Sequence, residues 1–310
     1  HSILALRLFV EIEGRLGVRL PVATLFQFPT LCGLAGRIDS AGRGEGKVEI
    51  MVPIQPRGAR APLFCVHAGD GGIIFYKPLG GHFAPERPVY GIEAPWLVGE
   101  HVERIGIGEL AARYLGHARM VQASGPLHLA GFSFGGIVAY EMAQQLARAG
   151  ELVGSLTLFD TANPADPPRR MGLRERMATN LAASSEMDVL QRAAYFAQRA
   201  VGKVGAQMLK HGEDSRAASA AKAKRGGGEL PAELRVLDSR RRSLEAMRAY
   251  RPDAACHGML LVRAEEREPG WHFAADLGWG AVVGSERLRI EQVPGRHHTI
   301  LLEPNVGAVA

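Results

Sequence analysis

A serine at position 133 lies in the pattern Gly-x-Ser-x-Gly, which spans residues 131–135. The apolar run at 127–130 predicts a strand before this motif, and the stretch at 137–147 predicts a helix after it. A tight turn between a strand and a helix requires glycine where the two backbones approach, and it leaves the serine hydroxyl exposed. Ser133 is therefore a candidate nucleophile. The alternative is a glycine-rich turn that contains a serine by chance.

A serine hydroxyl needs a general base within hydrogen-bond reach, and that base needs a third group to orient it. Asp160 directly follows the apolar run at 153–159, one helix and one strand after Ser133. We therefore expect it at the carboxyl edge of the strand next to the one before Ser133, where catalytic groups gather in open α/β sheets. Its other interpretation is a turn-capping residue beside Thr161.

The base is expected from a late loop of the chain, because the order serine, acid, histidine suits this strand–turn–helix arrangement. His297 and His298 are adjacent candidates in such a loop, and either could instead be a surface histidine. His67 and His128 lie in or beside predicted strands, and we interpret them as structural.

Backbone N–H groups that could hold an oxyanion occur at two places. Phe134 follows the candidate nucleophile at the expected helix N-terminus. Residues 67–72, His-Ala-Gly-Asp-Gly-Gly, form a loop whose glycines let the backbone approach a substrate closely, and Gly69 is the second candidate donor. Asp70 in this loop could suggest a metal or phosphate site, but it has no partner ligands, so the sequence predicts no metal.

The elements that must position these residues alternate between strand and helix. Strand patterns occur at 52–55, 63–67, 88–92, 127–130, 153–159, 259–264 and 288–293, and helix patterns at 73–79, 108–121 and 137–147. This alternation predicts an α/β fold with a parallel sheet. The last strand leads into a loop at 294–304 and a final helix.

The stretch 165–250 differs in character, because it is rich in Ala and Arg and helical in pattern. Helices are expected at 171–181, 189–201 and 235–250, with a break at 226–228. It contains 17 Lys and Arg against 10 Asp and Glu. Most of these charges fit a solvated helical surface. The functional interpretation is a lid whose basic face could meet an acidic partner domain.

The first 39 residues predict a helix at 2–16, a turn at 20–26 and a helix at 31–38. Three such short elements cannot bury a full core alone, so they look like the second half of a small helical bundle. Ser2 can N-cap the first of these helices. Residues 40–50 have the composition of a linker.

Composition bounds the remaining possibilities. The 310 residues are 46% hydrophobic and 22% charged, which predicts a soluble globular protein, and no apolar run approaches the ~20 residues of a membrane span. The net charge of +5 comes without a stripe of Arg and Lys interleaved with aromatics, which argues against nucleic-acid binding. With neither a signal peptide nor an initiator Met, we expect the sequence to begin inside a longer polypeptide.

Three cysteines, Cys32, Cys65 and Cys256, lie far apart and lack metal-ligand spacing. We interpret them as reduced core thiols, which favours a cytoplasmic location.

Residues 1–38 resemble the second half of an acyl or peptidyl carrier protein. The resemblance rests on three stretches, at 1–7, 20–21 and 25–30. It implies that Ser2 is the attachment site of 4'-phosphopantetheine.

Residues 51–310 resemble the terminal thioesterase domain of nonribosomal peptide and polyketide synthetases. The matching stretches lie at 52–56, 62–69, 130–136, 277–280 and 293–297. The resemblance implies an α/β-hydrolase fold with a helical lid at about 165–250. In the late motif of that family a Gly and one variable, often acidic, residue precede the catalytic His, a register that selects His297. Arg296 departs from the usual acid.

Together the two resemblances imply a carrier–thioesterase pair at the end of a synthetase. Its partners would be the carrier domain, the upstream synthetase modules and an acyl thioester, with no nucleic acid and no membrane. Ser133 would be the nucleophile, His297 the base and Asp160 the orienting acid. The N–H groups of Phe134 and Gly69 would hold the oxyanion.

The route of release is predicted from the lid stretch. Its few aromatics, Tyr195, Phe196 and Tyr250, favour an open cover and hydrolysis by water over cyclisation. The alternative functions are a stand-alone editing thioesterase or esterase, and a non-catalytic module that docks the carrier.

Overall fold

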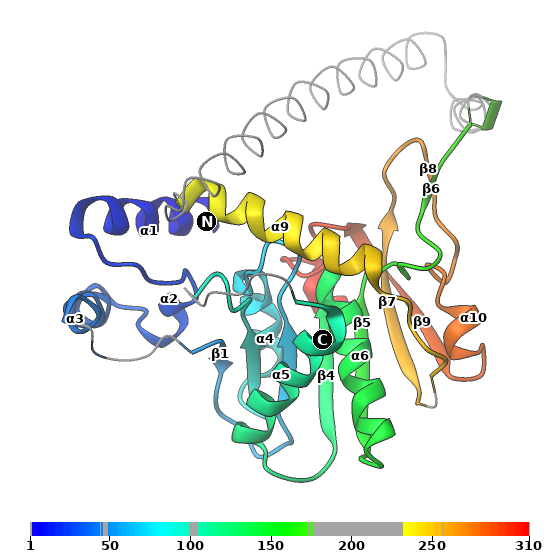
Figure 1. The fold of residues 1–310 in the computed structure, drawn as a ribbon, viewed down its shortest axis with the longest axis horizontal. Coiled ribbons are helices and arrows are strands. Elements are labelled where there is room, and N and C mark those ends of the chain that lie inside the picture. The colour runs from blue at the N-terminus through cyan, green and yellow to red at the C-terminus, as the bar shows by residue number, and fades with distance from the viewer. Residues whose placement is uncertain are drawn as a thin grey trace. The chain divides into compact units, whose positions relative to one another are not determined.

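The computed structural model describes residues 2–43, 45, 49–98, 105–172, 174–175, 232–255 and 257–309 (Figure 1). It divides into two compact units, of which the first comprises 1–167, 239–267 and 274–310 and the second 168–238 and 268–273. The strands are β1 (Met51–Gln55), β2 (Leu63–Val66), β3 (Val89–Ile92), β4 (Leu127–Phe132), β5 (Val153–Phe159), β6 (Arg169–Arg170), β7 (Met259–Glu266), β8 (Trp271–His272) and β9 (Leu288–Arg296).

The helices of the described residues begin with α1 (Ser2–Leu16), α2 (Thr24–Gln27) and α3 (Leu31–Gly42). They continue with η1 (Ile74–Tyr76), α4 (Lys77–Phe83), α5 (Ile107–Val121), α6 (Phe134–Arg148), α9 (Ala232–Ala249), α10 (Gly280–Val283) and η2 (Asn305–Ala308). Each strand and helix predicted from 51 to 159 is present, with ends that differ by a few residues. Phe134 begins α6, so that helix starts directly after Ser133.

The main sheet has seven strands in the order β1-β3-β2-β4-β5-β7-β9. All neighbours are parallel except β1 and β3, so the prediction of a parallel sheet is wrong for its first strand. Residues 56–62 between β1 and β2 are enough to reverse the chain but too few for the crossover that parallel strands need. The first strand therefore enters the sheet antiparallel, at its edge.

The register of the sheet determines which residues meet at its carboxyl edge. Phe132 at the end of β4 pairs with Phe159 at the end of β5. Phe159 in turn pairs with Val262 of β7, and Glu266 pairs with Arg296 where β7 and β9 end. The residues that follow these strand ends therefore gather along one edge.

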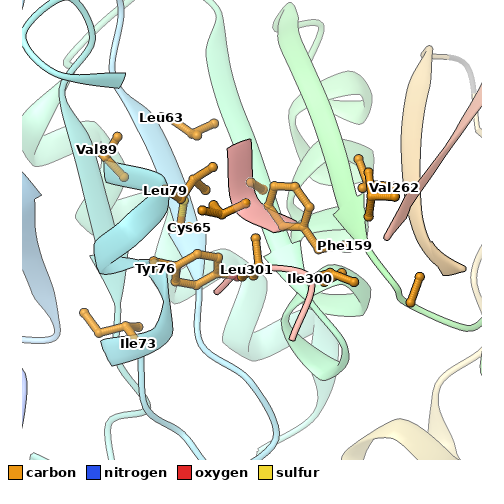
Figure 2. Packing of buried hydrophobic residues seen from close by; sticks show 14 of the residues in the cluster. Leu63, Cys65, Ile73, Tyr76, Leu79, Val89, Phe159, Val262, Ile300 and Leu301 are labelled. Carbon is orange, nitrogen blue, oxygen red and sulfur yellow. The ribbon is translucent and has the colours of Figure 1, made fainter. Parts of the chain in front are cut away.

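A hydrophobic core lies beneath this edge, between the sheet and the helices that cover it (Figure 2). All four residues of β2 are buried, as expected for a strand covered on both faces. Tyr76, Phe159 and Ile300 belong to one cluster, so the core joins η1, β5 and the turn after β9. Each such side chain contributes about 1.5–3 kcal/mol on burial. The loops that carry the candidate site thus rest on packed side chains.

Two cysteines fall among the described residues. Cys65 is buried in the core, whereas Cys32 is exposed. The interpretation of all three as core thiols is therefore wrong for Cys32, because α3 buries only Leu34 and leaves Cys32 on its outer face. Cys256 lies outside the described residues.

The N-terminal segment forms a small cluster of its own, centred on Phe9, Ile12, Leu20 and Leu34. The turn predicted at 20–26 contains a short helix, α2. Thr30 caps α3, since its side chain accepts a hydrogen bond from the Gly33 N–H at 3.2 Å. That helix ends at Gly42 and not at Ile38, since no glycine or proline signal interrupts residues 39–41.

Most of the lid predicted at 165–250 lies outside the described residues, including the expected helix at 189–201, most of the one at 171–181, and the break at 226–228. The helix predicted at 235–250 is present as α9, which begins three residues earlier. In the second unit β6 and β8 form a two-stranded antiparallel sheet. The sequence could not reveal it, because strands of two residues show no periodicity.

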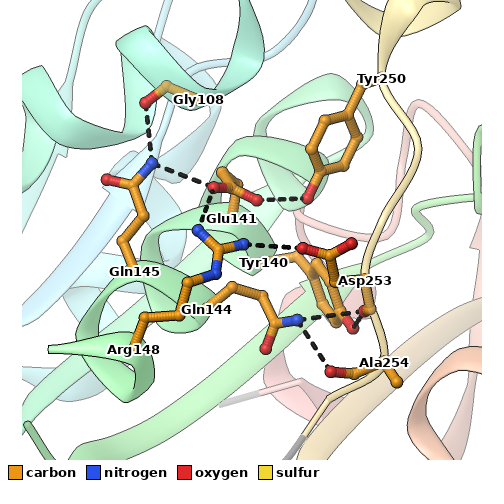
Figure 3. Close-up of polar contacts among 9 residues, drawn as sticks. All are labelled: Gly108, Tyr140, Glu141, Gln144, Gln145, Arg148, Tyr250, Asp253 and Ala254. Atoms are coloured by element: carbon orange, nitrogen blue, oxygen red, sulfur yellow. Dashed lines mark hydrogen bonds and ion pairs between the residues drawn. The ribbon is translucent and has the colours of Figure 1, made fainter. Parts of the chain in front are cut away.

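A polar network fastens the segment after α9 to α6 (Figure 3). The Glu141 carboxylate is buried and accepts hydrogen bonds from Tyr250 Oη at 2.7 Å, Gln145 Nε2 at 3.0 Å and Arg148 Nη1 at 3.2 Å. Tyr140 Oη donates to the Asp253 carbonyl at 2.6 Å. Burying a carboxylate is costly unless its oxygens are bonded, and here both are.

This network predicts the effect of removing one hydroxyl. Tyr250→Phe should lower the free energy of unfolding by about 1–3 kcal/mol, because the buried Glu141 carboxylate loses a donor. Urea unfolding followed by circular dichroism measures the loss. Arg241→Ala, which removes an exposed pair with Glu245, is the control and should change stability by about 0.5 kcal/mol or less. Equal losses in the two variants would contradict the network's role.

Candidate active site

Ser133 lies at the apex of the turn between β4 and α6, in a backbone conformation that serine rarely adopts. Its φ is 55° and its ψ is −118°. The Ser133 N–H donates to the Phe159 carbonyl at 3.0 Å, which holds the turn against β5. Such strain persists only where surrounding structure imposes it, and it is common at functional sites.

Three glycines make this turn possible. A side chain on Gly131 would collide with the backbone of Gly135, and one on Gly135 with the carbonyl of His67. These contacts confirm the roles predicted for both glycines. Gly136, which the sequence analysis did not single out, is equally constrained, because a Cβ there would collide with Thr161.

Asp160 follows β5 and lies almost fully buried at the sheet edge, with its side chain 2% exposed. Its Oδ2 lies 2.7 Å from His297 Nδ1. Its Oδ1 accepts the Ala264 N–H at 2.9 Å and pairs with Arg267 Nη1 at 2.8 Å. Asp160 therefore faces the late loop and β7 and does not serve as a simple turn cap.

The charge of this carboxyl group follows from the same contacts. Burial alone would raise the pKa of Asp160, but the hydrogen bonds from His297 and Ala264 and the charge of Arg267 outweigh it. The pKa is held below its usual range. Asp160 is therefore ionised at neutral pH and can accept a hydrogen bond from an imidazole.

His297 directly follows β9 and joins the other two residues. Its Nδ1 bonds Asp160, and its Nε2 lies 3.2 Å from Ser133 Oγ. The ring packs against Phe132 with centroids 4.7 Å apart. Because the ionised Asp160 can only accept, the proton lies on Nδ1 and the Nε2 lone pair faces the serine hydroxyl. This arrangement can remove the proton of Ser133.

His298 is exposed and touches His297 edge-on, with ring centroids 5.1 Å apart. Of the two late histidines that the sequence offered, the structure brings His297 to the serine. Arg296, the residue that departs from the family motif, pairs with Glu266 at 2.7 Å and so joins the ends of β9 and β7.

The two candidate oxyanion donors lie close to each other. Phe134 opens α6, and N–H groups in a first helical turn have no partner inside their helix. Gly69 lies in the loop after β2, where an added Cβ would stand 3.8 Å from the Phe134 Cβ. The loop that contains Gly69 and the start of α6 thus lie next to each other beside Ser133.

Arg267 is a site residue that the sequence analysis missed. It lies one residue after β7, beyond any strand pattern, and its side chain is 18% exposed where it pairs with Asp160. An arginine in a polar segment carries no sequence signal of its own, and only the register of β7 against β5 shows where it lies. Ala264, whose N–H bonds Asp160, was equally hidden.

The structure also shows the surroundings of three other residues that the sequence pointed to. Ser2 is the first residue of α1. His128 bonds Ser155 Oγ at 2.9 Å, which fits the structural role expected of it. Asp70 accepts the Gly72 N–H at 3.1 Å, and among the described residues no group of three or more potential ligands could hold a metal. In the same part of the chain, no helix is long and apolar enough to cross a bilayer.

Comparison with known families identifies the class of this protein. Residues 61–310 match the thioesterase domain family, and the chain belongs to that family, whose members are hydrolases that act on thioesters. Residues 1–38 match the phosphopantetheine attachment site family. The fold is that of the α/β-hydrolases, with the helical segment at the N-terminus.

Similar curated proteins are large synthetases. The chain is 37% identical over 167 residues to malpinin synthetase of Mortierella alpina, covering 54% of this chain and 2% of that one. It is 36% identical over 160 residues to a dimodular nonribosomal peptide synthase of Bacillus subtilis, covering 52% and 7%. The chain thus spans only a small part of these relatives.

Solved structures agree on the fold. The four-domain nonribosomal peptide synthetase holo-AB3403 matches the whole chain over 23% of its own length, with a TM-score of 0.63 and 27% identity. The NocB thioesterase domain matches 84% of this chain and 97% of its own, with a TM-score of 0.57 and 22% identity.

The contacts of Asp160 predict a pH-dependent change in stability. Arg267→Gln should lower the free energy of unfolding at pH 7 by about 3 kcal/mol, because it leaves a buried carboxylate short of a partner. The folded-state pKa of Asp160 is depressed, so this stabilisation is present above the usual value of about 3.9 and is lost as pH falls through the folded pKa. The free energies of unfolding of the native chain and of Arg267→Gln should therefore converge in acid.

Urea unfolding at pH 7, 5, 4 and 3 measures this difference. Arg296→Gln, which breaks a pair with both side chains mostly exposed, is the matched control and should cost less than about 1 kcal/mol. A difference between native and Arg267→Gln that stays constant down to pH 3 would contradict the pairing with Asp160.

Proposed function

We propose that this chain is a serine thioesterase that releases an acyl or peptidyl chain from the phosphopantetheine arm of a carrier domain by hydrolysis. The observation that carries the proposal is the position of His297, which contacts both Asp160 and Ser133 in one continuous hydrogen-bonded line. Membership in the thioesterase family and the nonribosomal peptide synthetases among its relatives support the substrate class.

In the first half of the reaction Ser133 Oγ attacks the thioester carbonyl while His297 Nε2 takes its proton. Asp160 stabilises the imidazolium that forms. The N–H groups of Phe134 and Gly69 donate to the oxyanion of the tetrahedral intermediate. When the intermediate collapses, the carbon–sulfur bond breaks, the proton passes from His297 to the leaving thiol, and an acyl-serine remains.

In the second half a water molecule attacks the acyl-serine, and His297 removes a proton from that water. Collapse of the second intermediate returns a proton to Ser133 Oγ and releases a free acid. The support for water over an internal nucleophile is the composition of the lid stretch, which is poor in aromatics and rich in Ala and Arg. A closed apolar chamber, which cyclisation needs, requires larger apolar side chains.

The carrier is proposed to be the N-terminal segment itself, with residues 1–39 as its C-terminal part, 40–50 as linker and 51–310 as the thioesterase domain. Its support is the match of residues 1–38 to phosphopantetheine attachment sites. Ser2 is the proposed attachment point. The test is transfer of phosphopantetheine to the complete carrier domain, which Ser2→Ala should abolish.

The two late histidines give a matched pair of variants. His297→Ala should lower turnover of an acyl thioester by about 10⁴-fold or more, as expected when a member of such a triad is removed. His298→Ala should keep most of the activity, because its exposed ring only borders His297. Steady-state kinetics on both variants measure the contrast. The opposite ranking would move the general base to His298.

Hydrolysis is tested with the native chain and a peptidyl thioester mimic in ¹⁸O-labelled water. A free acid that carries the label in its carboxyl group is expected. An unlabelled product that is lighter than the acid by one water would show that an internal hydroxyl or amine, and not water, attacks the acyl-serine. A fluorophosphonate that labels the native chain but not Ser133→Ala separates both outcomes from a module that only docks the carrier.

A further inference from the structure

His67 is a buried histidine outside the Ser133–His297–Asp160 line, and every polar atom of its ring is engaged. Its side chain lies at the end of β2 and has no exposed surface. Nδ1 lies 2.6 Å from the Ala68 carbonyl oxygen, and Nε2 lies 2.7 Å from Tyr114 Oη on α5. The ring is also enclosed by Trp96 on one edge and packs face to face against Phe134, with centroids 5.6 Å apart.

The chemistry of these partners determines the tautomer. Burial lowers the pKa of His67 to about 4, so the ring is neutral at physiological pH. A carbonyl oxygen can only accept, so Nδ1 must carry the single proton and donate it to Ala68. Nε2 is then an acceptor, and Tyr114 supplies the hydroxyl proton. The hydrogen bonds run in one direction, from Tyr114 to His67 to Ala68.

The Ala68 carbonyl belongs to the same peptide unit as the Gly69 N–H. A trans peptide is planar, with its C=O and N–H pointing in opposite directions, so fixing one fixes the other. The Ala68 oxygen also accepts the Gly71 N–H at 2.9 Å. The next peptide is held as well, because Ser239 Oγ lies 3.4 Å from the Gly69 carbonyl. Gly69 therefore has little freedom to rotate.

We infer that His67 and Tyr114 are positioning residues that aim the Gly69 N–H at the oxyanion formed on the substrate of Ser133. The inference rests on the proposed function and deepens it. His67 reaches both oxyanion donors at once, since its Nδ1 holds the peptide before Gly69 and its ring face packs on Phe134. Neither residue touches the reacting atoms.

The tautomer can be observed directly in the full chain. A ¹⁵N spectrum of the imidazoles at pH 7, with the His67 signals identified by their loss in His67→Asn, should show a protonated Nδ1 and an unprotonated Nε2. A proton on Nε2, or an imidazolium, would overturn the inference. This measurement does not depend on activity.

Two amide variants separate positioning from packing. The nitrogen of Asn can occupy the place of Nδ1 and donate to Ala68, whereas the nitrogen of Gln reaches the place of Nε2 and leaves Ala68 without its donor. We expect His67→Asn to keep kcat within about 10-fold, and His67→Gln to lose about 10²-fold with KM little changed, as when an oxyanion donor is lost. Packing alone predicts the reverse ranking, since Gln fills more of the imidazole volume.

The control is His128→Gln, which replaces a half-buried histidine remote from the carboxyl edge of the sheet. This variant should keep native kinetics. Equal losses in the two His67 variants, or a better His67→Gln, would refute the positioning role. If neither variant folds, Tyr114→Phe decides, because it removes only one hydroxyl. It should lower kcat several-fold at constant KM, and native kcat would overturn the role of Tyr114.

Failure of the proposed function looks different from failure of this inference. A native chain that neither turns over an acyl thioester nor forms an acyl-serine contradicts the serine thioesterase, whatever the tautomer of His67. A native chain that turns over, with variants that rank as packing predicts, contradicts only the positioning role.

Discussion

The carboxylate of Asp160 is the group on which the arrangement of the site depends. It is almost completely removed from water, and it keeps its charge because three partners from two other segments bond it. A buried, unpaired carboxylate would instead take up a proton. The ionised form fixes the tautomer of His297, and that tautomer presents a lone pair to Ser133. The same ion therefore stabilises the sheet edge and prepares the base.

Parallel pairing in the sheet is what brings these partners together. The ends of β4, β5, β7 and β9 lie in register, and each is followed directly by a residue of the site or of its support. Beneath them the core cluster joins the same strands to η1 and to the turn after β9. Local strain at Ser133 and Asp160, both with positive φ, is held by this packing.

Much of this could be predicted from the sequence, since each part had a local signal. The sequence pointed to Gly131 and Gly135 because a tight strand-to-helix turn requires glycine, and to Asp160 because it follows an apolar strand pattern. The strands themselves could be predicted from their apolar runs. Arg267 and Tyr114 had no such signal, because their partners come from other strands or helices. The predictions for β1 and Cys32 were wrong. The short loop after β1 determines its antiparallel direction, and the packing of α3 determines the exposure of Cys32.

Ser133 is the residue proposed to carry the acyl group during turnover. The most direct measurement mixes the native chain with a slowly released acyl thioester, quenches it in acid and locates the added mass by peptide mapping. One acyl group is expected, on the peptide that contains Ser133, and none in Ser133→Ala. Turnover by the native chain with no acylated peptide, or with the acyl group on another residue, would contradict it.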